Sequence, residues 1–293
     1  MSDNIRIGSF RILPPVVKNL LILNALFFLL KIVLWKINID LDALLGLHYF
    51  GATDFHVWQP LTYMFMHNDF GHLFFNMFAL WMFGAPIENM WGTKKFLIFY
   101  FITGIGAGLA HYLILSFQML PELSVINTFL DTPTMDNLSA VIQNHTFQIS
   151  EYSGRIYSDF ITFRSSLDHY QQFPNQNDTL LLNDATVFLS EYRSYFLNLP
   201  NIIGASGSVF GLLLAFGMSF PNSRIYLYFL IPIKAKWFVI AYGALELFYG
   251  VTGTQDGVGH FAHLGGMLFG FILILIWRKQ ERNRQNRNQE YYY

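Results

Sequence analysis

A serine between glycines is the residue of this chain best suited to chemistry. Ser206 lies in the run Gly204-Ala205-Ser206-Gly207, at the start of an apolar stretch that continues to Phe220. The glycines allow another backbone to approach closely, and a helix that begins here offers free N–H groups to a developing negative charge. A serine in a membrane helix usually bonds a carbonyl one turn back or eases helix packing, so Ser206 alone does not establish catalysis.

Three further polar side chains lie in other apolar stretches. His263 is followed by Gly266 and Gly270, which give its helix a face for close packing. His72 and Asn76 are four residues apart, so they share one helix face and could both donate to an oxyanion. The plainer alternative for this pair is a hydrogen bond between helices. A serine, a histidine and an amide on different apolar stretches suggest a hydrolase that works inside a bilayer.

The composition predicts a membrane protein. Of the 293 residues, 53% are hydrophobic and only 13% are charged, about half the charged fraction that is usual in a soluble domain. Six apolar runs have nearly the length of roughly twenty residues that crosses a bilayer core, and they are too long for barrel strands. We therefore expect an all-α membrane protein with six transmembrane helices. The runs cover 16–35, 70–91, 96–117, 202–220, 237–251 and 259–277.

Positive charge predicts the orientation of the chain. Lysine and arginine gather before the first run, between the second and third, between the fourth and fifth, and after the sixth. With both termini in the cytoplasm, all of these charges lie on the inner side. This places Ser206, His72 and Asn76 at the outer ends of their helices and His263 about one turn deeper. We expect a multi-pass protein of the bacterial inner membrane.

The remaining segments divide the chain into parts. Residues 37–66 are too apolar for a free loop and too broken to span, so we expect them in the membrane interface. Apolar and aromatic residues recur at helical spacing after Ile156 and after Phe188, which predicts a helical subdomain outside the membrane. The basic tail is expected to be disordered. The predicted parts are 1–15 (cytoplasmic), 16–117 (helices 1–3 with the first loop), 118–200 (insertion between helices 3 and 4), 201–277 (helices 4–6) and 278–293 (cytoplasmic tail).

The motifs resemble those of the rhomboid family of intramembrane serine proteases. The resemblance covers roughly 16–117 and 201–277. Three patterns carry it, in the right order on the right helices. They are the family's GxSG motif at Gly204 to Gly207, its HxxxN motif at His72 to Asn76, and its last-helix histidine with spaced glycines at His263, Gly266 and Gly270.

The resemblance implies a role for each residue. Ser206 would be the nucleophile and His263 the general base, in a dyad without a carboxylate. His72, Asn76 and the Ser206 backbone N–H would form the oxyanion hole. Phe210 matches the position whose aromatic ring packs on the catalytic imidazole. Supporting roles fall to Gly204, Gly207 and Gly266, and Glu88 and Gly92 match a structural pattern at the inner end of the second helix.

The same resemblance implies partners and leaves one alternative. The expected substrates are transmembrane proteins in the lipid bilayer, cut near the outer membrane face, with no cofactor, no metal and no nucleic acid. The first loop has Trp58-Gln59 where many members have a Trp-Arg pair, and the insertion replaces a loop that is short in bacterial members. A large insertion could bind partners, so the alternative is a non-catalytic rhomboid-like chaperone or adaptor that binds transmembrane helices. The intact serine and histidine argue against it.

Other ionisable residues receive structural interpretations. His260 lies one turn before His263 and raises the question of a metal site. Because no carboxylate or cysteine converges on this pair in the sequence, we do not expect one. His67 is expected to have an interfacial structural role, and His111 and Glu246 are expected to be packing or cavity groups. The chain has no cysteine, so thiol chemistry and disulfides are excluded.

Overall fold

The computed structural model describes residues 10–173, 178–227, 230–253 and 258–290, most of which are helical. The chain divides into two compact units. The core unit comprises residues 1–47, 56–111 and 202–293, and the insertion unit comprises 48–55 and 112–201. Parts of four predicted segments, at 1–9, 174–177, 228–229 with 254–257, and 291–293, lie outside the described residues.

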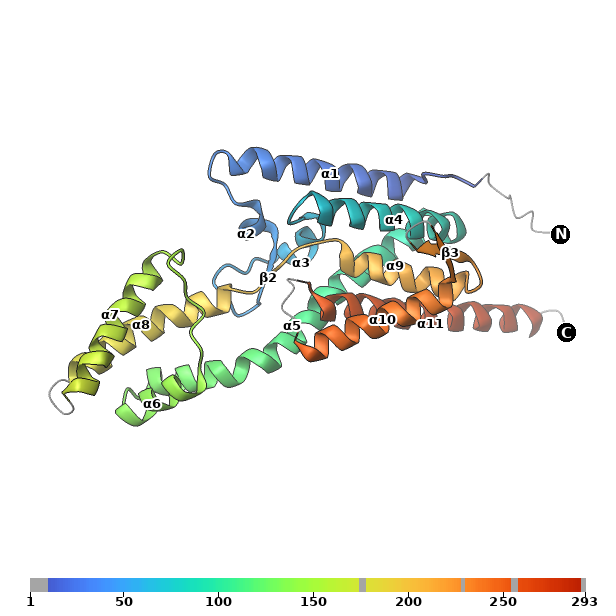
Figure 1. Cartoon of the computed structure of the whole chain (residues 1–293). Coiled ribbons are helices and arrows are strands. Elements are labelled where there is room, and N and C mark those ends of the chain that lie inside the picture. The colour runs from blue at the N-terminus through green and yellow to red at the C-terminus, as the bar shows by residue number, and fades with distance from the viewer. Residues whose placement is uncertain (1–9, 174–177, 228–229, 254–257, 291–293) are drawn as a thin grey trace. The chain divides into compact units, whose positions relative to one another are not determined.

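Six long helices each overlap one of the predicted apolar runs (Figure 1). Four of them, α1, α4, α5 and α11, are long and apolar enough to cross a membrane, and α9 is a shorter apolar helix. The count of six crossings therefore stays a prediction, because α9 has 14 residues and α10 has 18. The six helices that overlap the apolar runs are α1 (Pro15–Trp35), α4 (Phe70–Trp91), α5 (Thr93–Asp131), α9 (Ser206–Ser219), α10 (Ala235–Thr252) and α11 (His260–Glu290).

Short elements connect these helices. The first loop contains α2 (Leu41–Leu45), β1 (Leu47–His48), α3 (Gln59–Thr62) and the 3-10 helix η1 (Tyr63–Phe65), and β2 (Asn201–Ile202) precedes α9. Strands β3 (Arg224–Leu227) and β4 (Ile231–Lys234) pair antiparallel between α9 and α10, with Arg224 opposite Lys234. The loop before α4 is thus folded by short helices, and several of their apolar residues, such as Met64, are buried.

Two helices extend beyond the predicted limits. The third apolar run was expected to end at residue 117, but α5 continues to Asp131. The added part has an apolar stripe, and its side chains Leu123, Ile126 and Phe129 are buried within the insertion unit. The tail after residue 277 was expected to be disordered, which is wrong as far as Glu290, where α11 ends. Its lysine, arginine, glutamine and glutamate residues have good helix propensity.

Helix α9 contacts α4, α10 and α11, and glycines bring its backbone close to its neighbours. A Cβ atom added to Gly266 on α11 would lie 1.9 Å from the carbonyl oxygen of Gly207 on α9, so no side chain fits there. The Ala107 methyl group on α5 approaches Gly207 in a similar way, since a Cβ atom added to Gly207 would lie 2.3 Å from it. Small residues at helix crossings are the usual means of close packing in membranes. The start of α9 is thereby fixed between α5 and α11.

At the C-terminal end of α4, Glu88 joins α4 to α1. Its buried carboxylate accepts hydrogen bonds from the backbone N–H groups of Val16 and Val17, at 3.0 and 2.8 Å. These are N–H groups of the first turn of α1, which have no partner within the helix. Gly92 ends α4 with a φ of +79°, a conformation that favours glycine. The pattern at Glu88 and Gly92 therefore has a structural explanation.

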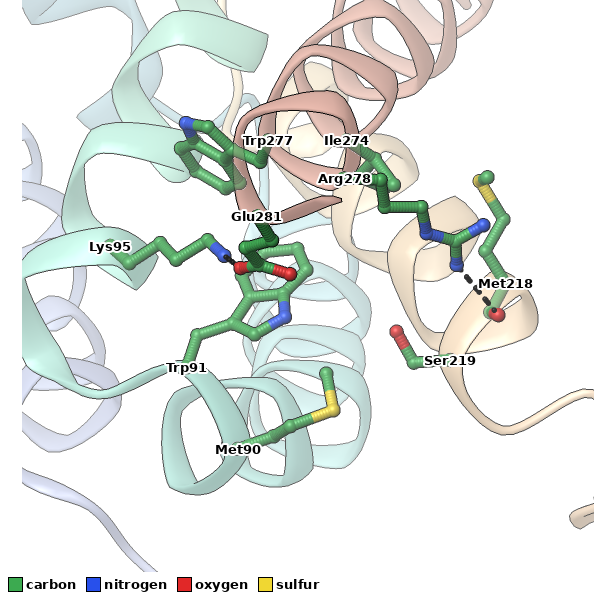
Figure 2. Close-up of a pocket in the computed structure, with 9 residues that line it drawn as sticks. All are labelled: Met90, Trp91, Lys95, Met218, Ser219, Ile274, Trp277, Arg278 and Glu281. Atoms are coloured by element: carbon green, nitrogen blue, oxygen red, sulfur yellow. Dashed lines mark hydrogen bonds and ion pairs between the residues drawn. The ribbon is translucent and has the colours of Figure 1, made fainter. Parts of the chain in front are cut away.

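A pocket of about 590 Å³ lies near this end of α4 and the C-terminal part of α11 (Figure 2). Lys95 pairs there with Glu281 at 2.9 Å and lies over the ring of Trp277. None of the predicted site residues lines the pocket. Because His72 is at the opposite end of α4, this pocket is separate from the candidate site.

The insertion unit has its own aromatic core. Helices α6 (Met135–Asn144), α7 (Arg155–Gln172) and α8 (Asp178–Asn198) follow α5, and α7 and α8 pack on each other. Phe163 and Phe188, which the helical spacing predicted to face a core, are buried with stacked rings 5.1 Å apart. First-loop residues join this unit, since the Asn198 side chain hydrogen-bonds the Thr53 hydroxyl and the Asp54 N–H. These residues thus form helices with a core of their own, and their place outside the membrane stays a prediction.

Candidate active site

Ser206 is the first residue of α9, directly after a turn whose geometry requires a glycine. Gly204 has a φ of +129°, and a Cβ atom there would lie 2.9 Å from His72 Nε2 and 3.7 Å from Ser206 Oγ. Any side chain at Gly204 would therefore be strained and would collide with the imidazole. The Gly204 N–H donates to the Tyr63 carbonyl at 2.9 Å, which fixes this turn. His72 and Ser206 thus lie around the same glycine.

His263 lies in the first turn of α11, and its ring is held by aromatic stacking. The Phe210 ring is parallel to the imidazole, with 4.0 Å between centroids and an angle of 8°. The Tyr242 ring also stacks on Phe210, at 5.2 Å. Because Ala262 and Gly266 of α11 both approach the backbone of Gly207, His263 lies at the same end of the helix pair as Ser206.

Glu246 is a partner of His263 that the sequence interpretation missed. Its Oε2 atom lies 3.0 Å from His263 Nδ1 and 2.7 Å from His260 Nδ1, and all three residues are buried. The resemblance implies a dyad without a carboxylate, whereas in this structure a carboxylate contacts the imidazole of His263. Glu246 was expected to be a packing or cavity group, and its hydrogen bonds to two histidines add a contact that this expectation did not include. The only signal in the sequence was an acidic residue within an apolar helix, which is functional by default in a membrane.

His72 and Asn76 both lie on α4, which packs on α9. The Asn68 N–H approaches His72 Nδ1 at 3.4 Å, so the hydrogen of the neutral ring belongs on Nε2, the atom beside Gly204. Asn76 is buried, and its Nδ2 has no hydrogen-bond partner among the described residues. A buried donor without a partner is costly, and in a native structure it calls for an explanation such as a catalytic role.

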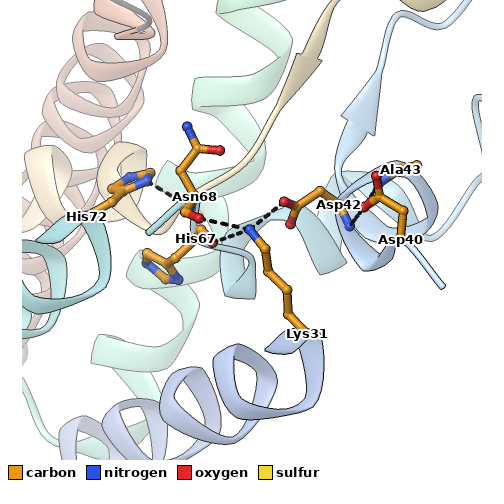
Figure 3. Close-up of polar contacts among 7 residues, drawn as sticks. All are labelled: Lys31, Asp40, Asp42, Ala43, His67, Asn68 and His72. Atoms are coloured by element: carbon orange, nitrogen blue, oxygen red, sulfur yellow. Dashed lines mark hydrogen bonds and ion pairs between the residues drawn. The ribbon is translucent and has the colours of Figure 1, made fainter. Parts of the chain in front are cut away.

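Lys31 fixes the segment that holds His72. Its Nζ atom donates to the carbonyl oxygens of His67 and Asn68, at 2.7 and 3.0 Å, and pairs with Asp42 at 2.5 Å (Figure 3). A lysine of α1 therefore joins α2 to the residues just before α4. Since Asn68 also contacts His72, this ion pair supports the orientation of that imidazole.

If the site hydrolyses transmembrane substrates, as the resemblance implies, Lys31→Met should lower the turnover number about tenfold. This is a fraction of the roughly 10²–10³ that complete loss of an oxyanion donor costs, because His72 itself remains. Lys31→Arg should recover part of the activity. Lys36→Met, outside this network, is the matched control, and equal rates for the Lys31→Met and Lys36→Met proteins would contradict the role of Lys31. The measurement is initial cleavage rate in proteoliposomes at fixed protein content.

His67 contributes packing to the same corner. It is fully buried, and its ring meets that of His72 edge-on at 5.1 Å between centroids. Burial lowers the pKa of His67 to about 3, with a smaller effect from His72, so the ring is neutral at physiological pH. A neutral ring fits the structural role that the sequence predicted for His67.

Comparison with known proteins points to one family. A family model described as "Rhomboid domain" matches residues 54–125 and 177–280, which is more than half of the chain. The matched ranges include Ser206, His263, His72 and Asn76, together with Glu246.

Individual relatives match over shorter stretches. The chain is 31% identical to "Rhomboid-like protease 3" of Toxoplasma gondii over 138 residues, 46% of this chain and 51% of the relative. It is 33% identical to "Putative rhomboid protease YdcA" of Bacillus subtilis (strain 168) over 110 residues, 36% of this chain and 52% of the relative. It is 38% identical to "Rhomboid protease GluP" of the same organism over 55 residues, 19% of this chain and 11% of the relative. The matches thus span about half or less of each relative's length. Since the described residues contain four helices of membrane length, this chain is a multi-pass membrane protein, and it belongs to the rhomboid family.

Proposed function

We propose that this protein is an intramembrane serine endopeptidase that cuts transmembrane substrates near the outer membrane face. The observation that carries the proposal is the clamping of His263 between the Phe210 ring and the Glu246 carboxylate, on a helix packed against the start of α9. Stacking on Phe210 fixes the plane of the His263 ring, and the contact with Glu246 fixes which ring nitrogen carries the hydrogen. A general base needs both, whereas a histidine that only fills space does not. The Rhomboid domain match and the relatives named as proteases support the same reaction class.

In the first step, His263 accepts the proton of the Ser206 hydroxyl while Ser206 Oγ attacks the substrate carbonyl carbon. As an ionised carboxylate, Glu246 only accepts hydrogen bonds, so it holds the hydrogen of His263 on Nδ1 and leaves Nε2 free to act as the base. The carboxylate also stabilises the imidazolium that forms. Glu246 is a positioning residue in this mechanism, because it acts through His263.

The negative charge on the former carbonyl oxygen then requires donors. His72 Nε2–H, the Asn76 amide and the Ser206 backbone N–H are the proposed donors. The imidazolium returns its proton to the leaving amine, the C–N bond breaks, and an ester to Ser206 remains. Water attacks this ester, again with His263 as base, and releases the new carboxyl terminus and free Ser206.

The test of the proposal is cleavage of a transmembrane reporter by the purified protein in proteoliposomes, together with labelling by a fluorophosphonate probe. Both should occur in the wild type, and neither should occur in Ser206→Ala. Absence of labelling in a folded wild-type protein would favour the alternative, a non-catalytic adaptor that binds transmembrane helices. The insertion, residues 118–200, supplies none of the proposed groups.

We expect His72→Ala and Asn76→Ala each to lower the turnover number roughly 10²–10³-fold, with little change in KM. Both donors serve one oxyanion, so the double mutant should be less impaired than the product of the two single effects. Single-turnover cleavage rates measure this. Phe75→Ala, an exposed neighbour on α4, is the control and should cleave at nearly the wild-type rate. Wild-type rates in all His72 and Asn76 variants would exclude the proposed oxyanion hole.

The orientation in the membrane is testable separately. Because basic residues follow the apolar part of α11 and lie at the junction of α4 and α5, reporters fused after Lys279 should be cytoplasmic, and reporters inserted within 130–190 should be exterior. Protease protection or paired enzymatic reporters in whole cells give the readout. The inverse pattern would move the proposed cleavage site to the cytoplasmic face.

A further inference from the structure

Two imidazoles and one carboxylate converge at a single point inside the core unit. Glu246 comes from α10, and His260 and His263 come from the first turn of α11. The same Glu246 oxygen lies 2.7 and 3.0 Å from the two Nδ1 atoms, and the possible ligand atoms all lie within 4.8 Å of one another. The sequence alone predicts no metal site here, because no carboxylate or cysteine lies beside the two histidines along the chain. Glu246 removes that objection.

We propose that Glu246, His260 and His263 form a binding site for a divalent transition-metal cation of the zinc type, and that its occupation excludes catalysis. Imidazole nitrogen and carboxylate oxygen are zinc ligands, and three protein ligands leave the fourth position of a tetrahedral ion for water. Magnesium and calcium prefer sites made mostly of oxygen, so they should not compete here. The part of the inference that concerns catalysis rests on the proposed function.

The observed distances require only a small rearrangement. Zinc bonds of about 2.0–2.1 Å in tetrahedral geometry separate the ligand atoms by about 3.3 Å. The present separations from Glu246 are a few tenths of an ångström shorter, as expected when hydrogens bridge these atoms. The cation would take the place of the two bridging hydrogens. All three side chains are buried and already in contact. The ion would therefore take the place of their hydrogen bonds, and no new buried space would have to open.

Binding at this point would reverse the tautomer of His263. When Nδ1 of a neutral imidazole coordinates a metal, the hydrogen of the ring must be on Nε2. A protonated Nε2 cannot accept the hydrogen of Ser206, so the proposed general base would be inactive. The positive ion would also oppose formation of the imidazolium. Zinc and catalysis would therefore be mutually exclusive, and removal of the metal by a chelator would restore activity.

Binding is tested without any need for activity. Chelator-treated Ser206→Ala protein is titrated with ZnCl₂ by calorimetry, and with CoCl₂ by visible absorption, which reports four-coordinate geometry. We expect one bound zinc ion per chain, and roughly tenfold or greater weakening when Glu246→Gln or His260→Gln is added. MgCl₂ should give no binding signal. Absence of zinc binding, or equal affinity in the Glu246 and His260 variants, would overturn the site.

Inhibition is tested on the wild type with the transmembrane reporter. Zinc should stop cleavage reversibly, and His260→Gln should raise the half-inhibitory concentration at least about tenfold, with each rate taken relative to the same protein without zinc. His67→Gln is the matched control for zinc acting at the neighbouring His67–His72 pair, and it should not change zinc potency. Zinc binding at the cluster without inhibition would overturn the exclusion of catalysis. If the wild type cleaves nothing while Ser206→Ala binds zinc, the proposed function fails and the metal site stands.

Discussion

Ser206→Ala and His263→Ala are each expected to lower cleavage of a transmembrane reporter by about 10⁴-fold or more, because loss of a nucleophile or its base typically removes nearly all of the rate that such a group of residues provides. Since the two residues act as one unit, the double variant should be no slower than either single variant. The measurement is product formation in proteoliposomes, with limits of detection set by long incubations.

Folding must be separated from chemistry in this experiment. Ser206→Ala removes one oxygen atom and should keep the thermal stability of the wild type. His263→Ala loses the stacking on Phe210 and the bond to Glu246, so its melting temperature should fall. His263→Asn is therefore included as a variant of closer size. Substantial cleavage by a purified Ser206→Ala protein would refute the assignment of Ser206 as nucleophile.

Glu246→Gln is expected to lower the turnover number by about 10²–10⁴-fold while KM changes little. The amide has nearly the same size, but it cannot stabilise the imidazolium as a carboxylate does, and its NH₂ group can hold the wrong tautomer of His263. Replacement of the carboxylate by an amide in a Ser-His-Asp triad has an effect at the upper end of this range. The measurement is kcat and KM from initial rates over a range of substrate mole fractions in the bilayer.

A merely structural role of Glu246 predicts a different result. Glu246→Asp keeps the charge and should recover part of the activity, whereas a packing role would make the shorter side chain the worse replacement. Glu88→Gln is the matched control, since Glu88 is another buried carboxylate and caps α1 far from His263. It should lower thermal stability and leave the kcat of the folded protein nearly unchanged. Equal kcat values for the wild type and the Glu246→Gln protein would show that His263 works without its carboxylate.

The positions of the long helices could be read from the chain because they depend on local properties. Apolar length placed α4 at residues 70–91, as predicted, and α1 and α10 within two residues of their predicted ends. Helical spacing of aromatic residues likewise predicted the buried core of α7 and α8, since an apolar stripe on a polar helix must be covered. The ends of α5 and α11 were underestimated because a helix that leaves the apolar run is no longer marked by hydropathy.

The sequence by itself determined which residues could carry the chemistry and that they lie in apolar helices. Ser206, His263, His72 and Asn76 are identified by short motifs, and a motif is a property of neighbours along the chain. The partners of these residues were decided only by the tertiary structure. Glu246 is 17 residues from His263 and Lys31 is 36 from His67, in different elements of the chain. Such contacts depend on the angle at which the helices cross and on the rotation of each helix about its axis. Close glycine packing among α5, α9 and α11 sets both, and neither can be read from residues that are neighbours along the chain.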